Sequence, residues 1–423
     1  MTNIFIKTFG CAINQSDSEV LAGYLHNAQF DITDNIDEAN LIIVNTCCVK
    51  KPTENNFFRY LDEIKKLRKP IVITGCIPQI MPEKVKEFSL LGTSQLTNIV
   101  DVVEETLNGS VVHLLVKEKN PRLNLPKIRR NDMIEIVPIC SGCLGAPCTY
   151  CIVPQARGKL VSYDVTQIVK QILEALVENV KEVWLTAQDT GCYGKDVNDS
   201  LPNLLRTILD IHNKFLIRLG MINPNHLLEY MDELIDIYKS DKMFKFLHMP
   251  VQSGNNDILK KMKRKYSVED FKKIVEKFRK EIPNITIATD IIVGFPTETK
   301  EQFLDSIKLI KAIKPDVLNI SRFWPRPGTQ AEKMKQIPGW ETKNRSRYIT
   351  DVFDWISFEN NKKWKNWQGP ILIDDHGKDD TFIGRNYAYK QVIVRSSSDI
   401  FGKILNVQVE QITKHDLRAR IIG

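Results

Sequence analysis

The nine cysteines are the side chains of this 423-residue chain best suited to chemistry. Four of them fall in the segment CSGCLGAPCTYC at 140–151, which has the spacing C-x2-C-x4-C-x2-C. Clustered thiols in a chain without a secretory signal are typical of metal sites. Zinc knuckles usually place their cysteines on arms with longer spacers, and the bacterial ferredoxin run has a different spacing as well. The spacing alone therefore does not decide between a zinc site and an iron–sulfur site. A [4Fe–4S] cluster on only Cys143, Cys148 and Cys151 would leave one iron free for chemistry, with Cys140 as a buried strand-end thiol.

The cysteines at positions 11, 47 and 76 are far apart in sequence but share a setting. Each follows directly after a segment with a strand-like pattern, and ligands of open parallel sheets bind at the carboxyl ends of the strands. These three thiols are therefore expected to converge in space. Cys48 would point away from Cys47 in an extended chain, and Cys192 stands alone, so both are expected to be packed thiols.

The first 118 residues alternate buried strands with helical patterns, which predicts a doubly wound parallel α/β domain. The strands are expected at 3–8, 39–45 and 70–74. The helices are expected at 16–26, with Ser16 or Asp17 as the cap, and at 54–67.

A basic, proline-containing segment at 117–130 reads as a linker, and a second series of strands and helices follows it. Six strand–helix units predict a partial or full parallel barrel with its function on the loops after the strands. The expected strands are 135–139, 182–187, 216–221, 244–249, 285–293 and 317–323. The expected helices include 165–177, 227–238, 268–281 and 301–313. From about residue 360, short strands and turns predict a small β-barrel.

Composition excludes several classes of protein. Hydrophobic residues make up 43% of the chain, which argues against disorder, and 59 basic against 52 acidic residues give a net charge of +7 that permits a polyanionic partner. No apolar run approaches the roughly 20 residues of a membrane span. The first residues lack the pattern of a signal peptide, so a cytoplasmic protein with no membrane partner is expected.

The cysteine segment, together with its neighbours, resembles the methylthiotransferase branch of the radical S-adenosylmethionine enzymes. The similarity spans nearly the whole chain in the family's order. The matching segments are TFGCAINQSDSE (8–19), NTC (45–47), TGC (74–76), GCLG (142–145) to CTYC (148–151), ARG (156–158), TAQDTG (186–191), GMINPNH (220–226), VQSGN (251–255), DIIVGFPTET (290–299) and RPGTQA (326–331).

The resemblance implies an N-terminal methylthiotransferase domain (1–118), a linker (119–130), a radical barrel (131–355) and a TRAM-like RNA-binding barrel (360–423). It also implies two [4Fe–4S] clusters and S-adenosylmethionine. An auxiliary cluster would be bound by Cys11, Cys47 and Cys76, and the radical cluster by Cys143, Cys148 and Cys151. The cofactor would be contacted by Tyr150, Gln188, Asp189 and Gln252. The family usually separates the first two radical-cluster cysteines by three residues, whereas this chain has four (Leu144, Gly145, Ala146 and Pro147).

The segments GMINPNH and TAQDTG are similar to the archaeal and eukaryotic branch, which implies methylthiolation of C2 of N6-threonylcarbamoyladenosine, 3′ to the tRNA anticodon. Contacts to the tRNA would come from Arg385, Lys362, Lys363 and Lys390. Arg385, in the segment GRN, is the strongest candidate because a guanidinium can bind phosphate through two hydrogen bonds. The chemistry further implies an electron donor such as a ferredoxin or flavodoxin, and a sulfur source. Methylthiolation of a ribosomal-protein aspartate, or a non-catalytic zinc-containing RNA-binding protein, are the alternatives.

Overall fold

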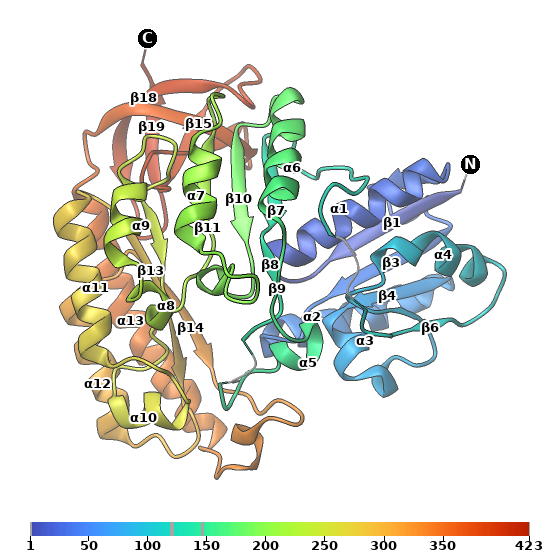
Figure 1. The fold of residues 1–423 in the computed structure, drawn as a ribbon, viewed down its shortest axis with the longest axis horizontal. Helices are drawn as coiled ribbons and strands as arrows, with labels where there is room; N and C mark the ends of the chain where they lie inside the picture. Colours follow the sequence, from blue (N-terminus) through green and yellow to red (C-terminus); the bar gives the residue numbers. More distant parts are fainter. Residues whose placement is uncertain (1, 119–121, 145–147, 423) are drawn as a thin grey trace.

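The computed structural model describes residues 2–118, 122–144 and 148–422. Three bodies follow one another along the chain (Figure 1): an N-terminal sheet with its helices, a central curved sheet and a C-terminal barrel. Among the described residues, no helix is long and apolar enough to cross a membrane.

The N-terminal body is a six-stranded parallel sheet with the strand order β2-β1-β3-β4-β5-β6. Its central strands β3 and β4 are buried along their whole length, which explains their continuous apolar runs. One face packs on α1 and α4 and the other on α2 and α3. The strands are β1 (Asn3–Thr8), β2 (Asp31–Thr33), β3 (Leu41–Thr46), β4 (Ile71–Gly75), β5 (Ser89–Leu91) and β6 (His113–Leu114). The helices are α1 (Ala12–Asn27), α2 (Lys51–Ile64), α3 (Cys76–Ile80) and α4 (Ile99–Leu107).

The start of α1 differs from the sequence-based expectation. The helix begins at Ala12 with Cys11 as its N-cap, not at a cap formed by Ser16 or Asp17. The polar residues of its first turns, which suggested a segment before the helix, are buried and bonded to neighbouring elements. Tertiary contacts therefore stabilise a helical segment that local composition does not favour.

The central body contains six parallel strands in two three-stranded sheets, β11-β10-β7 and β12-β13-β14. An isolated parallel bridge between Ile217 and Met243 joins the sheets. The strands are β7 (Ile134–Pro138), β10 (Glu182–Thr186), β11 (Leu216–Leu219), β12 (Phe246–His248), β13 (Thr286–Val293) and β14 (Val317–Arg322). The principal helices are α6 (Val165–Val177), α7 (Leu201–Leu209), α8 (Pro224–Leu227), α9 (Met231–Tyr238), α10 (Asn256–Lys261), α11 (Val268–Glu281), α12 (Lys300–Ile313) and α13 (Gly339–Lys362). The expected partial barrel of six units is confirmed.

Side-chain alternation separates an outer from an inner face of the curved sheet. Val183 and Leu185 of β10 pack in the core beneath the surrounding helices. Trp184 lies between them in sequence and so points to the inner face, as does Arg218 between Ile217 and Leu219 on β11. The inner face thus presents polar and aromatic groups rather than a continuous apolar core.

The C-terminal body is a closed barrel in the order β15-β16-β17-β19-β18, which α13 leads into. Its strands are β15 (Gln368–His376), β16 (Thr381–Arg385), β17 (Gln391–Arg395), β18 (Ile404–Ile412) and β19 (Leu417–Ile421). The barrel covers the amino ends of the central strands. Lys245, just before β12, donates its backbone N–H to the Tyr387 carbonyl at 2.8 Å, and Asp316, just before β14, lies 3.4 Å from Lys390 Nζ.

Candidate functional site

Three strand ends bring the distant cysteines to one edge of the N-terminal sheet. Cys11 caps α1 after β1, Cys47 follows β3, and Cys76 opens α3 after β4. The loops approach closely because Gly10 has a φ of +133° and a Cβ there would stand 2.8 Å from the Cβ of Cys47. The convergence expected from topology is thus seen in the electrostatic interactions among these three thiols.

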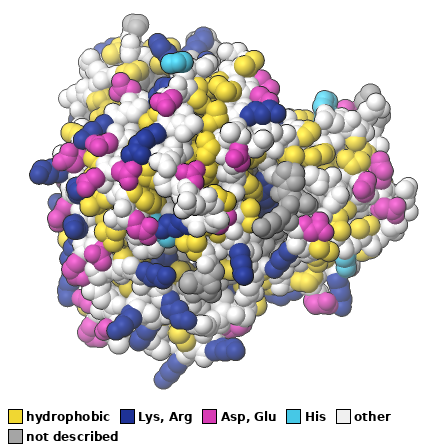
Figure 2. All heavy atoms as spheres, in the orientation of Figure 1, with side chains coloured by type: hydrophobic (Ala, Val, Ile, Leu, Met, Phe, Trp, Pro, Cys, Tyr) yellow, Lys and Arg dark blue, Asp and Glu magenta, His cyan; other side chains and the backbone are white. Residues whose placement is uncertain are grey.

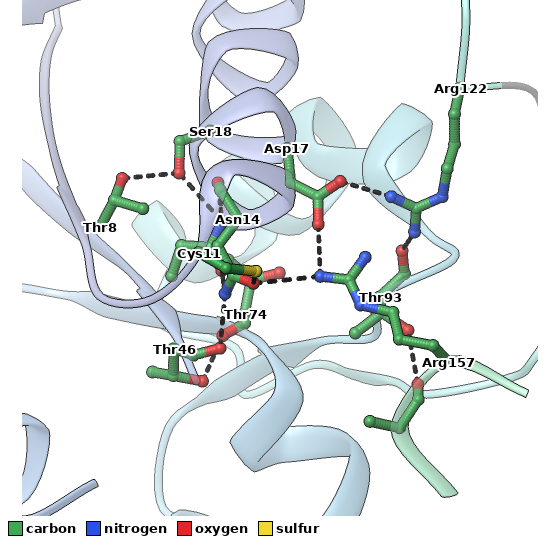
Figure 3. Close-up of polar contacts among 12 residues, drawn as sticks. Thr8, Cys11, Asn14, Asp17, Ser18, Thr46, Thr74, Thr93, Arg122 and Arg157 are labelled. Carbon is green, nitrogen blue, oxygen red and sulfur yellow. Dashed lines mark hydrogen bonds and ion pairs between the residues drawn. The ribbon is translucent and has the colours of Figure 1, made fainter. Parts of the chain in front are cut away.

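Two asparagines hold these strand ends together. The Asn14 side chain donates to the Thr46 carbonyl at 2.8 Å and to the Asn45 side chain at 3.0 Å (Figure 3). Asn45 donates in turn to the Asn14 carbonyl and to Ser18 Oγ, each at 2.9 Å. Because both amides are buried and satisfied, the first turn of α1 is fixed against β3.

An arginine from the central body reaches this thiol edge. Arg157 ends the short helix α5 (Val153–Arg157), which begins two residues after Cys151. Its guanidinium pairs with Asp17 at 2.8 Å and donates to Asn14 Oδ1 at 3.2 Å, while Arg122 pairs with the same Asp17 from the other side (Figure 3). In the sequence this arginine stands out only as part of the ARG motif, and nothing there indicates its contact with the thiol edge.

The surroundings of Cys76 favour a thiolate. The thiols of Cys47 and Cys48 donate to its sulfur, and together with the nearby Arg157 they hold the Cys76 pKa well below its usual value despite burial. Cys48 is buried in the apolar core, as expected of a packed thiol, yet it also lies beside Cys76 rather than wholly apart from the group.

The donor set at this edge fits an iron–sulfur cluster. No three His, Cys, Asp or Glu side chains in the described part of the chain converge on a single metal ion. A cubane instead spreads its thiolates, since each binds a different iron. Arg157 Nη1 is a buried donor with no partner among the described residues, and such a donor suits the sulfide and thiolate sulfurs of an anionic cluster.

The second thiol group lies in the loop after β7, between β8 (Cys140–Ser141) and α5. Cys143 forms an isolated bridge with Lys159, and its carbonyl accepts the Leu160 N–H at 2.8 Å. Cys151 donates its N–H to the Cys148 carbonyl at 3.0 Å. Three of the four residues that separate Cys143 from Cys148, those at 145–147, lie outside the described residues.

The pKa values of two thiols in this loop are raised, whereas that of Cys76 is lowered. Burial raises the pKa of Cys143 to about 11, and burial together with Cys148 raises that of Cys151 to about 12. A metal bound by these thiols would have to displace their protons. The three thiols lie near enough to interact electrostatically with one another.

An arginine also lies beside this second thiol group. Arg264 Nη1 lies 3.3 Å from Cys148 Sγ, and its Nε donates to Tyr266 Oη at 2.9 Å. Arg264 belongs to the basic run KKMKRK at 260–265. From sequence, the side chains of this run fit either a solvated helix face or a contact with phosphates. Its lysines are exposed, and basic side chains gather around α10 in Figure 2, whereas Arg264 turns inward. Nothing in the sequence distinguishes it from its neighbours.

Cys140 lies apart from this loop group. Its thiol donates to the Asp189 carbonyl at 3.8 Å, and Cys192 donates to the same oxygen at 3.0 Å. Both side chains are almost fully buried. This placement agrees with a strand-end thiol rather than a fourth ligand.

The four residues predicted to contact S-adenosylmethionine form two groups. Tyr150 and Gln252 line one cavity of about 290 Å³ together with Cys151 and Asp290. Gln188 accepts the N–H of Gly142, next to Cys143, at 2.7 Å. The Asp189 carboxylate is buried and accepts N–H groups of Gly191 and Asn223. The cofactor roles of all four stay predictions.

A larger cavity of about 580 Å³ opens on the inner face of the curved sheet. It extends from Cys11 and Gln15 of the N-terminal body to the C-terminal barrel. Its central wall is formed by Ile134, Ile136, Trp184 and Arg218, and its floor by Asp374, Arg385 and Tyr389. All three bodies thus contribute residues to one cavity, which no single motif in the sequence indicates.

The residues predicted to contact RNA occupy unlike positions. Lys362 and Lys363 are exposed, and they pair with Glu359 and Asp316 respectively. Lys390 is buried and donates to Asn361 Oδ1 at 3.0 Å, and Arg385 lies 3.4 Å from Asp374 at the cavity floor. Of these four residues, only the two lysines are exposed on the outer surface, and the RNA contacts stay predictions.

Three known families match successive parts of the chain. Residues 3–91 match the Uncharacterized protein family UPF0004, residues 137–310 the Radical SAM superfamily, and residues 370–422 the TRAM domain.

Relatives match nearly the whole chain. A probable threonylcarbamoyladenosine tRNA methylthiotransferase of Pyrococcus horikoshii is 42% identical over 399 residues, which cover 93% of this chain and 94% of the relative. A threonylcarbamoyladenosine tRNA methylthiotransferase of Homo sapiens is 40% identical over 431 residues, covering 99% of this chain and 74% of the relative.

A solved structure shares the fold. The radical S-adenosylmethionine methyltransferase TsrM of Kitasatospora setae superposes with a TM-score of 0.57 at 15% identity, over 78% of this chain and 75% of that one.

Proposed function

The chain belongs to the threonylcarbamoyladenosine tRNA methylthiotransferase family, and from this premise we propose that it transfers a methylthio group to C2 of N6-threonylcarbamoyladenosine, 3′ to the anticodon of tRNA. It is a transferase of the radical S-adenosylmethionine type, because its central body matches that superfamily. The observation that carries the proposal is the direct connection between two thiol groups. The helix α5 follows the loop cysteines, and its terminal Arg157 contacts the strand-end site.

The radical domain implies one [4Fe–4S] cluster and S-adenosylmethionine. We propose that Cys143, Cys148 and Cys151 bind this cluster. A second, auxiliary [4Fe–4S] cluster would be held by Cys11, Cys47 and Cys76. When bound, the first would supply the electron that cleaves S-adenosylmethionine to a 5′-deoxyadenosyl radical and the second the sulfur that is methylated and transferred.

The protein's own groups orient and neutralise these sites. Arg157 and Arg264 place a guanidinium beside each thiol group, where buried cations offset the accumulated negative charge of sulfur ligands. Tyr150 and Gln252 line the cavity beside Cys151 and would contact S-adenosylmethionine. Gln188, which accepts the N–H of Gly142 beside the loop, and Asp189 would hold its methionine half. The walls of both cavities would exclude water from reactive species.

We further propose the division into an N-terminal domain (1–118), a linker (119–130), a radical domain (131–355) and an RNA-binding domain (360–423). The substrate tRNA would contact exposed lysines such as Lys362 and Lys363. A ferredoxin or flavodoxin would supply electrons, a separate sulfur source would rebuild the auxiliary site, and the protein would act in the cytoplasm.

The function is tested by mass spectrometry of tRNA nucleosides from a strain that lacks the gene, before and after complementation. The proposal predicts loss of the methylthio form with accumulation of threonylcarbamoyladenosine, and recovery on complementation with the wild type. Complementation with Cys143→Ala should not restore it. Unchanged tRNA nucleosides together with a lost methylthio group on a ribosomal protein would favour the aspartate alternative. A zinc-loaded protein that does not cleave S-adenosylmethionine would contradict both.

A further inference from the structure

The large cavity on the inner face contains an arginine that forms no ion pair among the described residues. Arg218 of β11 points into it, and its guanidinium carbon lies 5.1 Å from the ring centre of Trp184, 5.4 Å from Phe246 and 5.3 Å from Tyr389. Its Nε is buried, and it has no hydrogen-bond or carboxylate partner among the residues that the structure describes. A buried cationic donor left unpaired is costly, so such a group marks a place for an anionic ligand.

The acidic groups nearby are already engaged. Asp374 lies against Arg385, and Glu19 accepts the backbone N–H of Arg130 and the side chain of Gln15. Glu182 accepts the indole N–H of Trp184 at 3.0 Å, and burial with Asp374 nearby raises its pKa to about 8, although Arg385 and Arg218 attract its charged form. No carboxylate among the described residues forms an ion pair or a hydrogen bond with Arg218.

Other polar atoms around this cavity also lack partners in the described structure. They include Glu182 Oε1 and Asp374 Oδ1. Buried polar atoms in native proteins are nearly always satisfied, and several orphans around one space indicate a polar ligand. The aromatic walls and the volume of about 580 Å³ suit a nucleoside rather than a water-filled gap.

We propose that this cavity receives the modified adenosine and that Arg218 binds the carboxylate of its threonylcarbamoyl group. The inference rests on the proposed function, which supplies the anionic substituent. A planar guanidinium pairs with a carboxylate through two parallel hydrogen bonds, and the aromatic rings keep it in place. Cys11 lines the same cavity, so the substrate would lie beside the strand-end thiol site. Arg218 therefore selects nucleosides that carry the acid.

The test compares RNA stem-loops that differ only at this carboxylate. Affinities of the iron-loaded protein are measured by fluorescence anisotropy for a threonylcarbamoyladenosine stem-loop and for its neutral carboxamide counterpart. We expect the wild type to prefer the acid by about tenfold or more, the range of one charge-assisted pairing. Arg218→Met, which keeps apolar length against the rings, should bring the ratio near one, and Arg218→Lys should restore part of it.

Two control variants test whether the preference for the acid stem-loop depends on Arg218 in particular. Arg206→Met removes an arginine from the outer helix α7, where it pairs with Glu233, and should leave the preference unchanged. Arg130→Met removes the exposed arginine at the cavity rim; if this variant alone abolishes the preference, the carboxylate binds there and the assignment to Arg218 is wrong. A wild-type ratio near one, or an unchanged ratio in both Arg218 variants, would also overturn it. If Arg218→Met does not fold, Arg218→Lys decides.

Failure of the proposed function gives a different pattern. In that case the wild type discriminates between acid and amide but forms no methylthio product from the acid stem-loop under reducing conditions with S-adenosylmethionine. Conversely, product formation without discrimination refutes the role of Arg218 and leaves the function standing.

Discussion

The strand-end thiols and the loop thiols are organised in opposite ways. Cys11, Cys47 and Cys76 come from three distant segments that a parallel sheet, two buried asparagines and an arginine hold in place. Cys143, Cys148 and Cys151 come from nine consecutive residues, and burial raises the pKa of two of them. The first site is held by contacts between distant segments, whereas the second lies within one short loop. Because contact with Cys76 and burial also raise the pKa of Cys47, a metal bound at either site would have to displace thiol protons.

The largest effect should appear when alanine variants of the adjacent residues Cys47 and Cys48 are compared. Cys47→Ala removes a proposed auxiliary ligand and should abolish methylthiolation while S-adenosylmethionine cleavage continues. Cys48→Ala, in the same core, should retain both activities because this thiol only donates to Cys76. Product and 5′-deoxyadenosine are quantified by liquid chromatography. Loss of methylthiolation in Cys48→Ala alone would shift the ligand assignment by one residue.

The next largest effect should be a difference in thermal stability between variants of Arg157 and of Arg264. Arg157→Met leaves Asp17 with Arg122 as its remaining pair, and breaking a buried ion pair costs about 3–5 kcal/mol, or roughly 10 °C in the unfolding midpoint. Arg264→Met removes hydrogen bonds but breaks no ion pair among the described residues, so the midpoint should fall by less. Thermal unfolding of the apo-proteins is followed by circular dichroism.

Arg157→Lys should recover part of the loss, because it keeps the charge without the planar fork. An equal loss of stability in the Arg157 and Arg264 methionine variants would mean that contacts between distant segments stabilise the strand-end site no more than the loop.

These positions show how far the sequence predicts the molecule. The helices α6 and α11 match their predicted bounds, because strong amphipathic patterns follow the capping residues Asp164 and Ser267. The grouping of Cys11 with Cys47 and Cys76 was predictable from strand order alone. In contrast, Arg157 acts through contacts to residues about 140 positions away, and Arg264 resembles its exposed neighbours. The burial of Lys390 likewise depends on Asn361 and Asp316 across two bodies.

A smaller effect should come from pH at the strand-end site. Burial raises the pKa of Glu19 on α1 to about 7, from 4.5 in an unfolded chain. The folded state therefore binds this proton more tightly, and the stability it contributes is present below pH 4.5 and lost as pH rises through 7. Glu19→Gln should raise unfolding free energy by up to about 3 kcal/mol at pH 8 and by less than about 1 kcal/mol at pH 5.

Urea unfolding of both proteins at the two pH values measures this difference. A gain that is independent of pH would show that the Glu19 carboxylate is charged throughout and is stabilised by its neighbours.

The smallest effect should come from Cys140, which precedes the loop cysteines but is not assigned as a cluster ligand. Cys140→Ala removes one buried sulfur beside Cys192 and should cost about 1 kcal/mol of stability, with iron content and cleavage unchanged. Altered visible absorbance or tighter S-adenosylmethionine binding in this variant would indicate that Cys140 is a cluster ligand.

The central claim is that two separate thiol triads hold two clusters, and iron analysis of anaerobically reconstituted protein tests it most directly. The wild type should bind about eight iron atoms. Replacement of Cys11, Cys47 and Cys76 by Ala should leave about four and preserve S-adenosylmethionine cleavage, and replacement of Cys143, Cys148 and Cys151 should leave about four and abolish it. A wild type that binds only about four iron atoms, all lost in one triad variant and all kept in the other, would contradict the claim.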